Sequence, residues 1–100
     1  MRGAKLLSYH YEHIKTEIMS DNESIRIGRN IRMIRELRNY DQQYVASRLF
    51  IGRSTLSTWE KGITPVKTES LKKLAEVFNL QSYRQIIDFD PDRLLQTKIY

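Results

Sequence analysis

The chain has 100 residues and a mass of 11.9 kDa, the size of one domain, and its lack of cysteine excludes disulfides, thiolate chemistry and Cys-ligated metal sites. With only 4 glycines and 2 prolines, the composition favours a helical protein. No apolar run approaches the about 20 residues that span a bilayer, so we expect a cytoplasmic protein without a membrane segment. Residues 26–67 hold nine basic residues against three acidic ones, a charge of +6, and the rest of the chain brings the net charge to +5. This favours a polyanionic partner, nucleic acid first, although a solvated helix face would carry the same charge.

Two segments near the start of the chain have apolar residues at helical spacing. In residues 4–19 the apolar stripe consists of Leu7, Tyr11, Ile14 and Ile18. In residues 24–38 it consists of Ile27, Ile31, Ile34 and Leu37. An arginine stands at every third position of the second segment, so the arginines spiral around the predicted helix. Arg35 and Arg38 then lie beside the apolar face, where each needs a partner or a path to solvent.

Two short helices with a tight connection are predicted next. Asp41 is a good N-cap for a helix that ends at Leu49, and Gly62 would stop a second helix that begins at Arg53. Leu56 and Trp59 lie on the back of this second helix. Its front is an arc of about 140° of small polar and basic side chains: Arg53, Ser54, Ser57, Thr58 and Lys61.

The remaining segments also have helical patterns. Thr68 is predicted to cap a helix with apolar residues at the i, i+3, i+4 and i+7 positions, and Asn79 suits its left-handed end. Ser82 and Gln85 have the spacing of a capping box, which opens a helix through Ile86, Ile87 and Phe89. A last short helix is expected after Pro91.

Two short helices joined by three residues are typical of a helix-turn-helix, which presents one helix to the major groove of DNA. A groove about 12 Å wide admits one helix, which must be held by its apolar back. Small hydroxyl side chains allow a close approach, and Arg53 can pair with a guanine through two hydrogen bonds.

The sequence resembles the Cro and phage-repressor-like (lambda-repressor-like, XRE-type) helix-turn-helix family. The resemblance rests on residues 41–49 and 53–62, with their closing Trp-Glu-Lys-Gly, and on residues 31–35 and 71–75 to either side. It implies an all-α bundle of five helices over residues 24–89, which binds double-stranded DNA to regulate transcription, commonly as a homodimer and here most simply as a repressor. Residues 1–23 would then be an N-terminal helical extension, and residues 90–100 a short C-terminal helix or tail.

The resemblance also implies roles for particular residues. The base-reading positions are Arg53, Ser54, Ser57 and Thr58. The positions that contact the DNA backbone are Gln42, Lys61, Thr64 and Lys67. Arg35 and Glu60 match an internal ion pair between the first helix and the recognition helix. One departure concerns Phe50, which stands where the family has glycine: either the turn is reshaped around Gly52, or Phe50 adopts a strained positive φ.

Other interpretations remain open at this stage. Arg26, Arg29 and Arg32 could contact phosphate or form a solvated face, and Tyr44 could pack on sugar-phosphate or on its neighbours. The fold could instead be an interaction module, such as an antitoxin or a regulator that sequesters a protein partner. Its working surface would then be the apolar stripe of residues 4–19 or the C-terminal Leu94, Leu95 and Ile99. Residues 4–19 could also support a homodimer or pack on their own bundle.

An enzyme is not expected, because there is no Gly-rich phosphate loop, no cysteine nucleophile and no paired carboxylates beyond the acidic cluster near the C-terminus, and no cofactor is implied. A nuclease or other small enzyme stays open as a third hypothesis, and it would depend on His10 or on that acidic cluster. No metal site is expected either. His10 and His13 have a metal-like spacing but no third ligand nearby, and the acidic cluster at Asp88, Asp90 and Asp92 is expected to cap the last helix.

Overall fold

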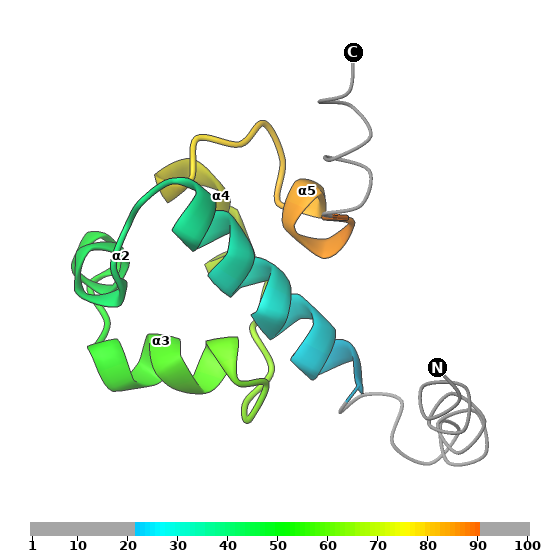
Figure 1. Ribbon diagram of the computed structural model, residues 1–100, viewed down its shortest axis with the longest axis horizontal. Helices are drawn as coiled ribbons and strands as arrows, with labels where there is room; N and C mark the ends of the chain where they lie inside the picture. Colours follow the sequence, from blue (N-terminus) through cyan, green and yellow to red (C-terminus); the bar gives the residue numbers. More distant parts are fainter. Residues whose placement is uncertain (1–21, 91–100) are drawn as a thin grey trace, which may run out of the picture.

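The computed structural model describes residues 22–90, which form five helices and no strand (Figure 1). The first spans residues 22–37 and is the longest. It is followed by α2 (Gln42–Leu49), α3 (Arg53–Glu60), α4 (Thr68–Val77) and α5 (Arg84–Ile87). The all-α bundle expected from the sequence is confirmed. The helices predicted over residues 4–19 and after Pro91 lie outside the described residues.

The ends of these helices follow from local sequence signals. The Asp41 carboxylate accepts a hydrogen bond of 2.8 Å from the Tyr44 N–H and caps α2. Gly62 has a φ of 75° and ends α3, as predicted, because glycine adopts this conformation without steric cost. Asn79 has a φ of 61° after α4 and lets the Leu80 N–H bond back to the Ala75 carbonyl oxygen at 2.8 Å.

Two predicted helix starts meet different outcomes. The prediction that Thr68 caps α4 is wrong by one residue, because Lys67 is the extended N-cap and its carbonyl already accepts the Leu71 N–H at 2.9 Å. The predicted capping box before α5 is only half formed, because Tyr83 is the N-cap of α5 and the Gln85 N–H donates to the Ser82 carbonyl and not to its hydroxyl. The Gln85 Oε1 accepts the Ser82 N–H at 3.1 Å, and the Ser82 Oγ accepts the Arg84 N–H at 3.1 Å.

The core lies where the apolar faces of the helices meet. α2 packs against both α3 and α4, and α4 packs against α5. The buried apolar side chains are Ile31, Ile34, Val45, Ala46, Leu56, Leu71, Leu74, Ala75, Phe78 and Ile86. Each large one contributes about 1.5–3 kcal/mol by leaving water. The helix at residues 22–37 crosses the bundle, and α2 and α3 lie beside one another at one end (Figure 1).

Polar side chains of the first helix, and of Arg38 directly after it, satisfy carbonyl groups at the ends of two other helices. The Arg26 guanidinium donates to the Ile87 carbonyl oxygen, and the Asn30 Nδ2 donates to that of Ile86 at 2.9 Å. The Arg38 Nε donates to the Phe78 carbonyl oxygen at 2.8 Å. The last carbonyls of a helix have no partner within it, so these bonds fix α4 and α5 against the first helix. Arg38 thereby has the partner that its position required.

Candidate nucleic-acid interface

The turn between α2 and α3 is formed around Phe50. Phe50 has left-handed angles, φ 59° and ψ 41°, while Gly52 is extended at φ −75° and serves as the N-cap of α3. The Ile51 N–H bonds back to the Ala46 carbonyl oxygen at 3.0 Å and closes the end of α2. Of the two possibilities left by the sequence, a turn reshaped around Gly52 is therefore wrong, and Phe50 adopts the strained angle itself.

α3 has a buried back and an accessible front. Leu56 is fully buried and Trp59 is half-buried against the core. On the front, Arg53 and Ser54 are exposed, and Ser57 and Thr58 are half-buried. The structure thus brings the four predicted base-reading residues to one side of α3. Their reach differs, because the side chains of Arg53 and Ser54 stand further into solvent than those of the next turn.

The Thr58 hydroxyl has partners within the protein. It donates to the Thr55 carbonyl oxygen at 2.7 Å, one turn earlier in α3, and its Oγ1 lies 3.3 Å from the Thr64 Oγ1. A hydroxyl has one proton and two acceptor lone pairs. Since the proton is directed to Thr55, Thr58 presents to a ligand mainly an acceptor and a methyl group. The contact with Thr64 also ties the loop after α3 to the front of that helix.

A buried ion pair between Arg35 and Glu60 holds α3 against the first helix. The Arg35 Nε donates to the Glu60 Oε2 at 2.7 Å, and the Arg35 Nη2 donates to the Glu60 Oε1 at 3.1 Å. The two side chains are 11% and 4% exposed. This is the ion pair that the family resemblance implied. Its two parallel hydrogen bonds are the strongest arrangement that arginine and a carboxylate form. The hydrogen bond to Glu60 is the largest cause that raises the pKa of the Arg35 guanidinium.

The same pair extends to α2. The Gln42 Nε2 donates to the Glu60 Oε1 at 2.9 Å, and the Arg35 Nη1 donates to the Tyr40 carbonyl oxygen at 2.9 Å. Gln42 was predicted to contact a DNA phosphate, and its amide nitrogen has a second proton that remains for such a contact. The network therefore fixes the orientation of Gln42, a role that the sequence did not reveal.

The other predicted backbone contacts are exposed beside α3. Lys61, Thr64 and Lys67 lie in the loop from α3 to α4. Lys61 also borders a shallow hollow of about 150 Å³ lined by Arg32, Arg35, Gln42, Ser57, Glu60 and Lys61. This hollow lies between the front of α3 and the first helix, and Arg32 and Lys61 are among the cationic side chains that line it.

The three arginines left open by the sequence have different surroundings. Arg26 bonds to the Ile87 carbonyl and, at 3.1 Å, to Glu23, so it has a structural role. Arg32 forms a solvent-exposed ion pair of 3.2 Å with Glu36 beside the hollow. Arg29 is exposed. Arg32 is the member of this series that lies next to the predicted DNA-facing residues.

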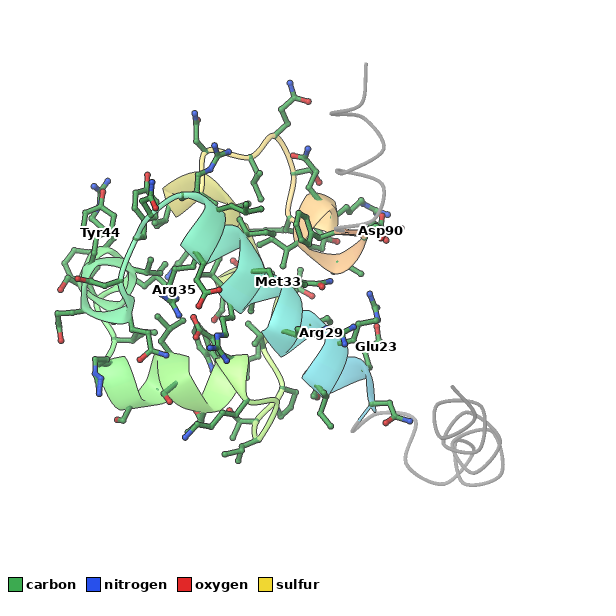
Figure 2. The ribbon with its side chains drawn as sticks, viewed as in Figure 1. Glu23, Arg29, Met33, Arg35, Tyr44 and Asp90 are labelled. Carbon is green, nitrogen blue, oxygen red and sulfur yellow. The ribbon has the colours of Figure 1, made fainter. Side chains whose placement is uncertain are left out.

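Tyr44 packs on its neighbours at the outer side of α2 (Figure 2). The ring centroids of Tyr44 and Tyr40 lie 4.6 Å apart. The Arg48 guanidinium lies 5.7 Å from the centroid of the Tyr44 ring. The Tyr44 hydroxyl accepts from Arg48 at 3.1 Å. Part of the ring nevertheless remains accessible to solvent.

Among residues 22–90, no cluster of three His, Cys, Asp or Glu side chains could hold a metal ion. Over the same residues no helix is long and apolar enough to cross a membrane. His10, His13 and Asp92 lie outside the described residues.

Two short helices joined by a tight turn, the second held from behind and presenting a polar and basic front, define a helix-turn-helix domain. The family model described as helix-turn-helix matches residues 31–83, more than half of the chain, and the chain belongs to this lambda-repressor-like family of DNA-binding domains. Searches of curated proteins and of solved structures found no match.

Proposed function

We propose that this protein is a sequence-specific regulator of transcription that inserts α3 into the major groove of double-stranded DNA. The observation that carries the proposal is the two-sided character of α3. Leu56 and Glu60 are buried and hold the helix from behind, whereas Arg53 and Ser54 are exposed on its front. A helix held in this way can present base-reading side chains in a fixed orientation.

Separate residues would supply sequence selectivity and affinity. Arg53, Ser54, Ser57 and Thr58 would meet base edges, and Arg53 can bind a guanine through two hydrogen bonds. Gln42, Lys61, Thr64 and Lys67 would contact phosphates on either side, with the N-terminus of α2 adding its positive dipole near Gln42. These contacts set the register, whereas the α3 front discriminates between sequences.

The protein would act as a homodimer and as a repressor. One α3 of eight residues covers only a few base pairs, so a selective site requires two copies on half-sites about one helical turn apart. A bound dimer would repress by occupying DNA that the transcription machinery needs. Such a function requires no cofactor or catalysis, and a cytoplasmic location fits it.

Selection of bound duplexes from a random pool tests the proposal. We expect an enriched sequence with two-fold symmetry and binding that weakens steeply as salt is raised, because phosphate contacts release counterions. No enrichment, or equal binding to every duplex at all salt concentrations, would reject the proposal. The alternative function, an interaction module working through residues 4–19, would give that negative result.

A further inference from the structure

The hollow between the front of α3 and the first helix has the polar groups of an anion site. Its lining residues are Arg32, Arg35, Gln42, Ser57, Glu60 and Lys61. Arg35 and Glu60 form a buried ion pair, so their charges offset each other. The charges that remain are the cations of Arg32 and Lys61. The volume of the hollow is about 150 Å³, and since one water occupies about 30 Å³ in the liquid, a phosphate group has room in it.

Two of the lining residues indicate which phosphate would reach the hollow. Ser57 belongs to the front of α3, which is assigned to base edges, and Gln42 is assigned to a DNA phosphate. The Gln42 amide donates one proton to the Glu60 carboxylate at 2.9 Å and keeps the other for a ligand. When α3 lies in the major groove, the sugar-phosphate backbone at the edge of the groove passes beside these residues. The hollow would then face a phosphate of the bound duplex.

Arg32 is the lining residue for which an acidic neighbour competes. Its Nε donates to the Glu36 Oε2 at 3.2 Å, one turn later on the first helix. The two side chains are 63% and 53% exposed, and Glu36 does not line the hollow. An exposed ion pair of this kind is weak, because water solvates both charges. DNA concentrates negative charge along its backbone, so a phosphate can displace the single carboxylate from Arg32.

We infer that Arg32 contacts a DNA phosphate at the hollow, and that Glu36 limits the affinity for DNA by holding Arg32 away from that phosphate. The inference rests on the proposed function, since it adds a contact and a restraint to the same site. Arg32 is not among the backbone contacts that the family resemblance implies. On binding, the Arg32 guanidinium exchanges one carboxylate for one phosphate. The free energy of the Arg32–Glu36 pair is therefore subtracted from the affinity of each bound copy.

Titration of the full chain with the duplex enriched by selection, at several salt concentrations, tests the inference. Arg32→Gln should weaken binding to all duplexes alike and reduce the salt dependence by about one slope unit per bound copy. Glu36→Gln should strengthen binding about two- to five-fold per bound copy, which is the strength of an exposed ion pair expressed as a ratio. Both side chains are exposed, so neither change should disturb the fold.

Matched variants on the same helix control for the effect of charge at a distance. Glu23→Gln removes the carboxylate that pairs with Arg26 at 3.1 Å, and Arg29→Gln removes an exposed cation; neither Glu23 nor Arg29 lines the hollow. Each should change the affinity by less than the corresponding change at Glu36 or Arg32. The double variant separates competition from general repulsion, because competition requires the arginine. In the Arg32→Gln background, Glu36→Gln should give no gain in affinity.

Other results would overturn the inference. If Arg32→Gln changed neither the affinity nor its salt dependence, Arg32 would not contact DNA. If Glu36→Gln gave no gain, or gave the same gain in the Arg32→Gln background, Glu36 would not restrain Arg32. In these cases the wild type still binds the duplex, so the proposed function stands. A wild-type chain that binds no duplex at any salt concentration would reject the proposed function and this inference together.

Discussion

Gly28, in the middle of the first helix, lies against the carbonyl oxygen of Trp59 near the end of α3. A Cβ atom placed on Gly28 would lie 2.2 Å from that oxygen and 2.9 Å from the carbonyl oxygen of Glu60. The first helix and the recognition helix therefore approach backbone to backbone at this point. A glycine inside a helix costs stability relative to alanine, so its presence here has a packing reason.

Gly28→Ala is expected to lower the free energy of unfolding by about 1–3 kcal/mol, because the added methyl group meets backbone atoms that cannot rotate away. Chemical denaturation measures this loss. Arg29→Ala is the control, since the neighbouring exposed position should change stability by less than about 0.5 kcal/mol. Equal stability of the wild type and Gly28→Ala would show that the two helices can separate without cost.

The sequence alone predicts local features of this fold well. Asp41, Gly62 and Asn79 act on backbone atoms within a few residues of themselves, and so their positions mark helix ends. The polar front of α3 is equally readable, because helical periodicity separates it from Leu56 on the buried back. The predicted N-cap of α4, Thr68, is wrong by one residue, because Lys67 has no side chain that typically caps a helix.

Contacts between distant parts of the chain are a different matter. The sequence around Gly28 does not indicate that Gly28 lies against Trp59. Asn30 is an ordinary polar residue in the sequence, yet it is buried and donates to the Ile86 carbonyl at the end of α5. Such partners depend on how the helices pack. The ion pair of Arg35 and Glu60 is predicted only by the family resemblance, because the local sequence holds no information about this long-range contact.

Glu60→Gln is expected to destabilise the protein by about 3 kcal/mol, since it leaves the buried Arg35 guanidinium without a counter-charge. Thermal or chemical unfolding would show this. The pKa of Arg35 is raised in the folded protein. The charge of Arg35 therefore adds to the free energy of unfolding at every pH below the ordinary arginine pKa, and this stabilisation is lost only in strong alkali. The stabilisation that the Arg35 charge provides should therefore not vary with pH across the neutral range.

The control for this change is Glu36→Gln, which removes the exposed partner of Arg32 and should cost less than about 1 kcal/mol. If Glu60→Gln cost no more than Glu36→Gln, the buried network would not be what holds α3 in place.

Arg53→Ala and Lys67→Ala are expected to affect DNA binding in different ways. Replacing Arg53 should relax the preference at one base position of each half-site, because its guanidinium is assigned to a base edge. Replacing Lys67 should weaken binding to all duplexes alike and reduce the salt dependence by about one slope unit per bound copy. Titration of matched and single-substituted duplexes at several salt concentrations separates the two effects. A uniform loss with Arg53→Ala would reject its base-reading role.

Phe50→Asn is expected to stabilise the folded protein, because asparagine tolerates the left-handed backbone angle of this position. Relief of the left-handed strain should raise the free energy of unfolding by up to about 1 kcal/mol, measured at concentrations too low for association. Asn79→Phe is the reciprocal control, since it introduces the same strain at a φ of 61° and should destabilise by a similar amount. A gain in folding stability would show that the fold does not depend on a phenylalanine at this turn. If Phe50→Asn instead destabilised the protein, the phenyl ring would be supporting its own bundle by more than the backbone strain costs.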